Sequence, residues 1–247
     1  SNSVGFSVGD NPVPTFTSLT PNTALRLQTL QVTLRGTNFY NGISSVNLGS
    51  GITVQSTVID SATQMRLTIV VTDSAATGAR TVSVVNASPG GGTASLLNGF
   101  TVTNPIPTVT GLSIQNGARL QTLTLTLTGT KFVKGATVVS LGAGIGVTAT
   151  AVQSQTELQA TLTIDSSAAL GPRNVMVTNP APGGGSAQLA DAFTVNNPVP
   201  TVTTLLPEST LVAAASTSLQ VNGTNFVPGS VVRLGADDPT SEPGELT

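Results

Sequence analysis

The sequence has 247 residues, of which 8% are charged, and its formal net charge is −2. Ordinary soluble domains carry about 25% charged residues, and the nine Lys and Arg residues of this chain are scattered singly. This excludes the basic patch that binding to nucleic acid or to an acidic membrane surface requires. The chain has no Cys and no His, which excludes Ser-His and Cys-His nucleophiles and His or Cys metal sites. No apolar run approaches the ~20 residues of a membrane helix, so we expect no membrane insertion in this segment.

The sequence repeats itself with a period of 93 residues. The tetrad Asn-Pro-x-Pro begins at Asn11, Asn104 and Asn197, and both 104 minus 11 and 197 minus 104 give 93. This period is too long for a solenoid unit and fits one whole small domain. We predict the following segments: the closing strand of a preceding domain at 1–10, complete domains at 11–103 and 104–196, and the N-terminal half of a third domain at 197–247.

Alternating apolar and polar residues predict β-strands along the whole chain. In the first unit the alternation occupies 30–35, 65–71, 82–84 and 100–102, and the second unit repeats it. It is most regular at 123–128, where Leu alternates with Thr. A period of two is typical of half-buried antiparallel strands. About seven short strands in each ~93 residues, without helical periodicity, predict an all-β fold of tandem immunoglobulin-like β-sandwiches joined end to end.

The same alternation predicts the core. We expect it to contain Val32, Leu34, Phe39, Leu67, Ile69, Val82, Val84, Phe100 and Val102, with their counterparts 93 residues further on.

The unit Gly-Thr-x-Phe recurs at 36–39, 129–132 and 223–226 and ends the second predicted strand. We interpret its Gly as a backbone turn that is closed to residues with a Cβ. We interpret its Phe as a plug at the end of the sandwich, rather than as an exposed binding aromatic.

The Pro-x-Pro pairs lie where one domain passes to the next, and the Pro-Gly-Gly-Gly runs lie between the last two predicted strands of each unit. Pro lacks a backbone donor and fixes φ, so the three Pro-x-Pro pairs predict short, stiff junctions. The Pro-Gly-Gly-Gly runs at 89–92 and 182–185 predict flexible hairpin turns. A phosphate cradle is disfavoured there, because no helix follows to supply its amide end.

Four sequence patterns together resemble the IPT/TIG family of immunoglobulin-like domains. They are Pro-Thr-x-Thr-x-Leu (107–112), Gly-Thr-Asn-Phe (36–39), Gly-x-x-Val-x-Leu-Gly (229–235) and a closing Phe-Thr-Val (100–102), and they cover two full copies and a partial third. In its Thr-rich tandem form the resemblance implies a bacterial surface protein or adhesin. The family also occurs as a spacer in starch-processing enzymes, and in plexin-type receptors and Rel-type transcription factors. The last two settings are disfavoured, because the chain lacks Cys and basic loops.

The remaining polar residues give little sign of a chemical site. Asp237-Asp238, followed by Glu242 and Glu245, lacks the ligand spacing of calcium loops and is interpreted as a solvated acidic loop. The lack of Trp and the single Tyr40 disfavour a stacking platform for sugars or bases. The triplets that begin at Asn86 and Asn222 fit N-glycosylation, but so short a pattern arises often by chance. We therefore predict no catalytic, cofactor-binding or metal-binding residues, no cofactor and no enzyme.

These observations favour a non-catalytic structural or adhesive repeat array of an extracellular, bacterial-type surface protein or filament. Its partners would be neighbouring copies of the same domain, in head-to-tail self-association. One alternative is a spacer module of a secreted carbohydrate-active enzyme, and another is a ligand-binding module that uses the loops at the end of a sandwich. The sequence that flanks this segment would distinguish them, since further repeats favour the array and a catalytic domain favours the spacer.

The two ends of the sequence are out of phase with the repeat. Gly5-Phe6-Ser7-Val8 matches Gly99-Phe100-Thr101-Val102, so we expect an excerpt from a longer array. The alternative is strand exchange, in which Ser3–Gly9 of one subunit adds to the half-domain of the next.

Overall fold

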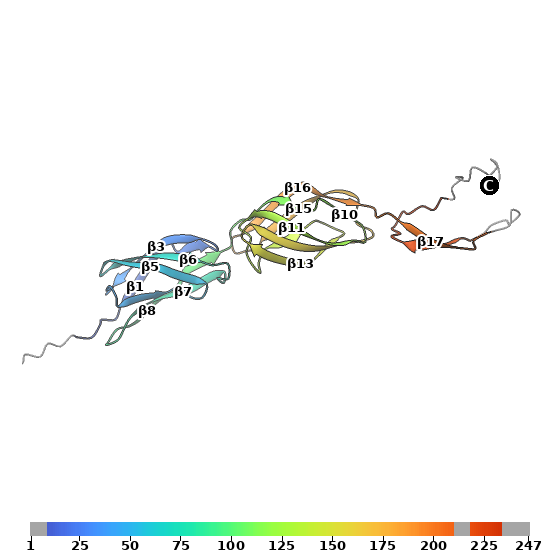
Figure 1. The fold of residues 1–247 in the computed structure, drawn as a ribbon. Helices are drawn as coiled ribbons and strands as arrows, with labels where there is room; N and C mark the ends of the chain where they lie inside the picture. The colour runs from blue at the N-terminus through green and yellow to red at the C-terminus, as the bar shows by residue number, and fades with distance from the viewer. Residues whose placement is uncertain (1–8, 210–217, 234–247) are drawn as a thin grey trace, which may run out of the picture.

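The computed structural model describes residues 9–209 and 218–233. These residues form eighteen β-strands (Figure 1). No helix in this part of the chain is long and apolar enough to cross a membrane. The regular elements of the described residues are all strands, so the fold is all-β, and these strands form tandem immunoglobulin-like sandwiches joined end to end (Figure 1).

The first sandwich pairs two four-stranded sheets, β1-β3-β6-β5 and β2-β8-β7-β4. Its strands are β1 (Thr15–Thr20), β2 (Thr23–Leu25), β3 (Thr29–Thr37), β4 (Ser44–Asn47), β5 (Ile52–Ser61), β6 (Gln64–Val71), β7 (Gly78–Asn86) and β8 (Gly92–Thr103). All pairs are antiparallel except β2 with β8, which is parallel.

The second sandwich repeats this topology with the sheets β13-β14-β11-β9 and β10-β16-β15-β12. Its strands are β9 (Thr108–Leu112), β10 (Asn116–Ala118), β11 (Thr122–Thr130), β12 (Val138–Ser140), β13 (Ile145–Ser154), β14 (Glu157–Ile164), β15 (Gly171–Asn179) and β16 (Gly185–Asn196). Beyond it, β17 (Thr201–Leu206) pairs with β18 (Gln220–Thr224) in a two-stranded sheet.

The predicted alternation decides which face of each strand is buried. In β11, Leu125 and Leu127 are buried, while Thr124 and Thr128 are exposed. Leu125 lies opposite Ala160 of β14 in the antiparallel register, and both belong to the same core cluster. The strand therefore forms because one face enters an apolar core while the other keeps hydroxyls in water.

Two separate core clusters confirm the expected core residues. All nine residues named for the first sandwich are at most 1% exposed, and they lie in one cluster. The counterparts in the second sandwich, Leu125, Leu127, Phe132, Ala160, Leu162, Val175, Val177, Phe193 and Val195, are also at most 1% exposed and form the other cluster.

Each sandwich contains eight strands rather than the seven that the sequence suggested. The additional strands, β2 and β10, are three residues long and run parallel to the last strand of their sandwich. Three residues are too short to show an alternating pattern, so local sequence could not reveal them.

The Gly of Gly-Thr-x-Phe has a different role from the predicted turn. Gly36 lies within β3 and is absent from the positive-φ positions, whereas Asn38, two residues later, has a φ of 62°. A Cβ on Gly36 would lie 2.7 Å from the Phe39 ring and would clash with the Thr15 carbonyl oxygen. Gly is therefore required because the ring folds back over the strand, and the residue before Phe makes the turn.

The Phe plug is buried where a complete sandwich surrounds it. Phe39 and Phe132 are 1% exposed, as predicted, but Phe226 beside β18 is 39% exposed. The second sandwich covers Phe132 with both of its sheets, whereas the described residues around Phe226 supply the β17-β18 pair alone.

We predict that Phe132→Ala lowers the free energy of unfolding of the second sandwich by about 3–5 kcal/mol, because it leaves a cavity in a packed core. Phe226→Ala is the matched control and should lower the stability of the chain by less than about 1.5 kcal/mol, since its ring is already partly in water. Denaturant titration of both variants measures the difference, and equal losses would contradict the plug.

Candidate functional site

The junction between the two sandwiches is the most highly organised site outside the cores. At its centre is the peptide group that joins Thr103, the last residue of β8, to Asn104. The carbonyl oxygen of Thr103 accepts a hydrogen bond from the Arg26 amide of the first sandwich at 2.8 Å. The N–H of Asn104 donates to the Pro182 carbonyl of the second sandwich at 2.9 Å. One planar group is thus held from both sides, and no free residue separates the sandwiches.

The side chain and the carbonyl of Asn104 add two further hydrogen bonds to the second sandwich. Its Nδ2 donates to the Pro180 carbonyl at 2.7 Å, and its carbonyl accepts from the Gly184 amide at 2.7 Å. Asn104 is 3% exposed, and its Oδ1 is buried without a hydrogen-bond partner. Three of its polar groups are therefore used to attach one residue to the loop between β15 and β16.

This loop is the Pro-Gly-Gly-Gly run. It packs against the backbone of the junction, whereas the sequence predicts a flexible turn. It does join two paired strands, so the predicted hairpin is confirmed. Gly183 has a φ of 70°, and a Cβ there would lie 2.8 Å from the Asn104 oxygen and 2.8 Å from the Thr103 Cβ. The glycines thus allow the loop to approach the incoming backbone more closely than other residues could.

A buried Asn ties the junction to the rest of the second sandwich. Asn179, at the end of β15, is 1% exposed. Its Nδ2 donates to the carbonyls of Pro105 and Lys131 at 2.8 and 2.9 Å, and its Oδ1 accepts from Thr137 Oγ1 at 2.6 Å. Burying an amide costs free energy for each donor or acceptor that is left unpaired. Asn179 therefore fixes the Pro-x-Pro segment, the Gly-Thr-x-Phe turn and the start of β12 relative to one another.

The first sandwich has the same arrangement around Asn86. Its Nδ2 donates to the carbonyls of Pro12 and Asn38 at 2.8 Å, and its Oδ1 accepts from Ser44. Because both amide hydrogens are used and the side chain is 2% exposed, the folded sandwich withholds this residue from N-glycosylation. The sequence predicts Asn86 only as the first residue of a glycosylation triplet, and it does not predict the structural role of this residue.

The three copies of the Asn-Pro-x-Pro tetrad differ in burial. Asn104, which follows one sandwich and enters another, is buried, whereas Asn11 is half-buried and Asn197 is exposed. The Asn196 carbonyl accepts from the Arg119 amide at 2.9 Å, and Asn197 Oδ1 accepts from Arg119 Nη1 at 3.2 Å. The second junction thus repeats the contacts with the preceding sandwich.

Arginines brace the loops at the end of each sandwich that faces the junction. Arg26 Nε donates to the Ala75 carbonyl at 2.6 Å, and Arg119 Nε donates to Ala168 at 2.7 Å. Arg80 donates to the carbonyls of Leu48, Ser50 and Ala76. Burial lowers the pKa of Arg80, and the positive charge of Arg26 lowers that pKa further. These cations are used to satisfy loop carbonyls, which favours a structural role over a ligand-binding one.

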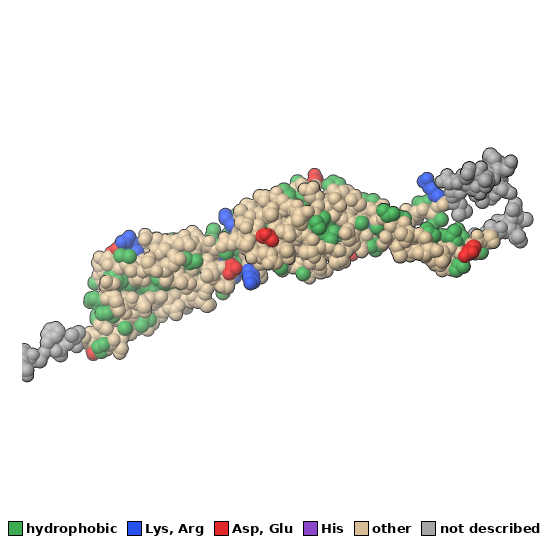
Figure 2. Space-filling view, viewed as in Figure 1, with side chains coloured by type: hydrophobic (Ala, Val, Ile, Leu, Met, Phe, Trp, Pro, Cys, Tyr) green, Lys and Arg blue, Asp and Glu red, His purple; other side chains and the backbone are tan. Residues whose placement is uncertain are grey.

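Charged side chains are few on the surface visible in Figure 2. Within the described residues, no group of three or more His, Cys, Asp or Glu could hold a metal ion. The acidic residues Asp237, Asp238, Glu242 and Glu245 lie outside the described part of the chain. Asn222 of the second glycosylation triplet uses its Nδ2 to donate to Thr204 Oγ1 at 2.9 Å.

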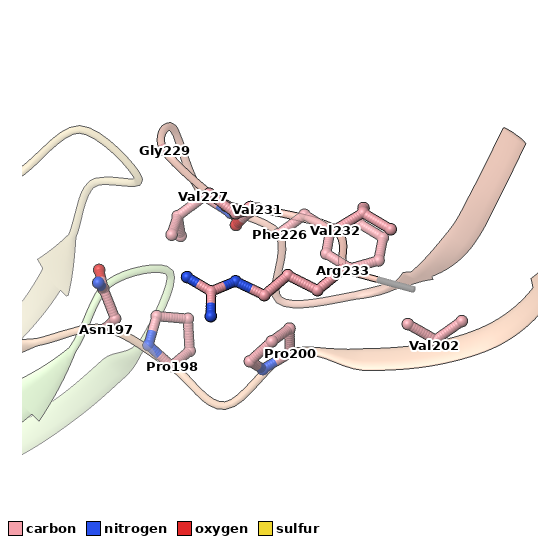
Figure 3. A pocket seen from close by; sticks show the side chains of 11 residues that line it. Asn197, Pro198, Pro200, Val202, Phe226, Val227, Gly229, Val231, Val232 and Arg233 are labelled. Carbon is pink, nitrogen blue, oxygen red and sulfur yellow. The ribbon is translucent and has the colours of Figure 1, made fainter. Parts of the chain in front are cut away.

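An apolar groove of about 390 Å³ lies on the β17-β18 unit (Figure 3). The Arg233 side chain extends across it between Pro198 and Val227. Val202 in this groove is 59% exposed, whereas its counterpart Val109 is 8% exposed. In the second sandwich, strands β15 and β16 contribute to the core that covers Val109. The groove is therefore the inner face of a sandwich, seen without a facing sheet among the described residues.

A second hollow, of about 430 Å³, lies beside β10 and β16 on the second sandwich. It is lined by Leu112, Gln115, Asn116, Leu189, Asp191, Ala192, Thr194 and Asn196. Its surroundings are mainly short polar side chains, and none of them is His, Cys or an aromatic residue.

Comparison with known proteins gives one family model and a set of solved structures, each similar to only part of this chain or at low identity. A family model described as "Quinohemoprotein amine dehydrogenase, alpha subunit domain III" matches residues 14–91, which is less than half of the chain. No curated protein matches the sequence.

Solved structures with tandem immunoglobulin-like domains are similar to this chain. "Titin Ig tandem domains A164-A165" has 10% identity and a TM-score of 0.38, over 76% of this chain and 99% of that one. The Yersinia pseudotuberculosis adhesin InvE has 14% identity and a TM-score of 0.44, over 74% of this chain and 58% of that one. The Escherichia coli adhesin FdeC has 16% identity and a TM-score of 0.29, over 80% and 70%. All three TM-scores are below 0.5, so these likenesses are reported as similarities and carry no argument about this chain.

We predict that Gly183→Ala loosens the junction, because the new Cβ would meet the backbone of Asn104. The matched control is Gly171→Ala in the same sandwich, where φ is 96° and nothing lies within 4 Å of the added Cβ. Both variants should destabilise the second sandwich by about 1 kcal/mol through the left-handed backbone. Only Gly183→Ala should also broaden the distribution of distances between spin labels on the two sandwiches.

We also predict that Lys131→Asn stabilises the second sandwich. Lys131 has a φ of 59°, a conformation that Asn adopts more readily than Lys. In the first sandwich the counterpart Asn38 donates from Nδ2 to the Val13 carbonyl at 2.8 Å, a bond that Lys131 does not reproduce. The gain should be about 0.5–1.5 kcal/mol. The reverse change, Asn38→Lys, should destabilise the first sandwich by a similar amount in chemical denaturation, and a gain in stability there would contradict this interpretation.

Proposed function

We propose that this chain is a stiff, non-catalytic repeat array that serves as a structural or adhesive part of an extracellular surface protein or filament. The observation that carries the proposal is the peptide group between Thr103 and Asn104, which is hydrogen-bonded to both sandwiches. A binding or catalytic module does not require such a junction, whereas a spacer that must hold a fixed length and direction does.

Each copy of the repeat supplies both halves of such a junction. In each sandwich, the loop that ends at Arg26 or Arg119 contacts the backbone that leads into the next Asn-Pro-x-Pro tetrad. The Pro-Gly-Gly-Gly loop and the buried Asn before it contact the tetrad with which that same sandwich begins. Identical ends joined head to tail make a heterologous contact that extends without closing. This supports an array of neighbouring copies of the same domain, divided at 11–103, 104–196 and 197–247, with the IPT/TIG resemblance as its family setting.

The composition supports a role without chemistry. The chain has no His or Cys, and its best-ordered polar groups, such as Asn179 and Arg80, are engaged with the backbone. Thr and Ser side chains replace charges on the outer faces, which suits an exposed protein without disulfides. On these grounds we propose that the protein lies at a bacterial-type cell surface.

A second candidate is a spacer module of a larger secreted enzyme. The family model that matches residues 14–91 is named after a domain of an enzyme subunit, and this observation favours it. That enzyme is an amine dehydrogenase rather than a carbohydrate-active enzyme. The stiff junction would serve this role as well, by holding a catalytic domain at a fixed distance.

Spin labels placed on the two sandwiches test the stiffness directly. The chain contains no Cys, so Gln31→Cys with Thr124→Cys introduces a single pair of labels at exposed, equivalent positions of β3 and β11, which are inner strands of their sheets. We expect one narrow distance distribution that salt and mild crowding leave unchanged. A broad or multimodal distribution would contradict the proposed function.

A further inference from the structure

The free edge of β13 is the longest exposed strand edge of the second sandwich. β13 pairs with β14 on one side, and its other side is unpaired in the sheet. Register shifts at Val147/Ala149 and Val152/Ser154 leave a regular stretch at 149–152. Residues 148–151 are exposed on both faces of the strand. An exposed edge presents unpaired N–H and C=O groups that can pair with another strand.

Charged side chains are one of the devices that protect such edges, and the edge strand β5 of the first sandwich carries one. In β5, Asp60 accepts a two-pronged hydrogen bond from Arg66 of β6 at 2.7–3.0 Å. This contact with Arg66, with a further hydrogen bond from Gln64, lowers the pKa of Asp60, so the carboxylate stays charged. The sheet β1-β3-β6-β5 also carries Arg35.

The equivalent sheet of the second sandwich has lost these charges. Asp60 and Arg66 are replaced by Gln153 and Gln159, which form a neutral hydrogen bond at 3.3 Å. Arg35 is replaced by Thr128, and within the strands β13, β14, β11 and β9 the single charged residue is Glu157. The two edge strands thus differ in one charged residue, since β5 carries Asp60 and β13 carries none.

Small neutral side chains make an edge favourable to bury. Thr150, Ala149 and Ala151 lose little side-chain entropy on packing, and they carry no charge that must be desolvated. The formal net charge of −2 gives little repulsion between copies. A strand of identical sequence meets all of these conditions.

We infer that β13 is a lateral docking edge, and that its partner is β13 of a second copy of this chain. The two strands pair antiparallel about a two-fold axis near Thr150 and join two four-stranded sheets into one. The contact lies on the side of the array, so it is separate from the head-to-tail junction and would connect neighbouring arrays sideways.

Sedimentation equilibrium of residues 1–247 over a range of concentrations tests this inference. We expect a reversible dimer whose dissociation constant rises by at least about tenfold in Thr150→Lys, because two like charges then face each other. The control is Thr57→Lys, which makes the same change at the equivalent position of β5 and should leave the dimer intact. Thr150→Ser should also leave it intact, and thermal unfolding establishes that all three variants fold.

Hydrogen exchange gives an independent measurement on the unmodified chain. Those amides of 149–152 that point away from β14 should become protected as the protein concentration rises, while those of 56–59 should show no such change. A chain that stays monomeric at all concentrations would overturn the inference. So would a dimer that Thr150→Lys leaves unchanged, which would point instead to the apolar groove at Val202 and Phe226.

Discussion

The peptide group between Thr103 and Asn104 is the constraint on which the arrangement of this molecule depends. A peptide group is planar and rigid, so fixing its carbonyl in one sandwich and its N–H in the other leaves little freedom between them. Pro105 and Pro107, both buried, restrict the backbone that follows. The stiffness that we predict for the junction therefore rests on hydrogen bonds at the joint itself, as well as on the proline residues that the sequence shows.

The receiving side of the joint depends on a buried polar group rather than on apolar packing. Asn179 satisfies two carbonyls and one hydroxyl that come from three separate segments. Losing it would leave those groups buried without partners, which is costly in a region closed to water. The start of each sandwich is thus coupled to the end of β7 or β15, and the joint can form only when the sandwich is nearly complete.

The β17-β18 unit illustrates this dependence. Its Ser230 accepts from the Val227 amide at 3.0 Å, just as Thr137 accepts from Val133. The local turn therefore forms with these few strands. Phe226 and Val202 nevertheless remain exposed, because burial needs the facing sheet and not the turn alone.

The sequence by itself determined the repeat, the strand faces and the core, because alternation and periodicity are local properties of the chain. The alternation of Leu with Thr around Leu125 is enough to predict that this side chain faces the core, without knowing which strand packs against it. Tertiary structure decided the rest. Asn179 acts through residues 74 and 48 positions away, and Gly36 is required by a ring and a carbonyl that fold against it. Such contacts are set by how strands pair across the sandwich, and neighbouring residues carry no record of that pairing.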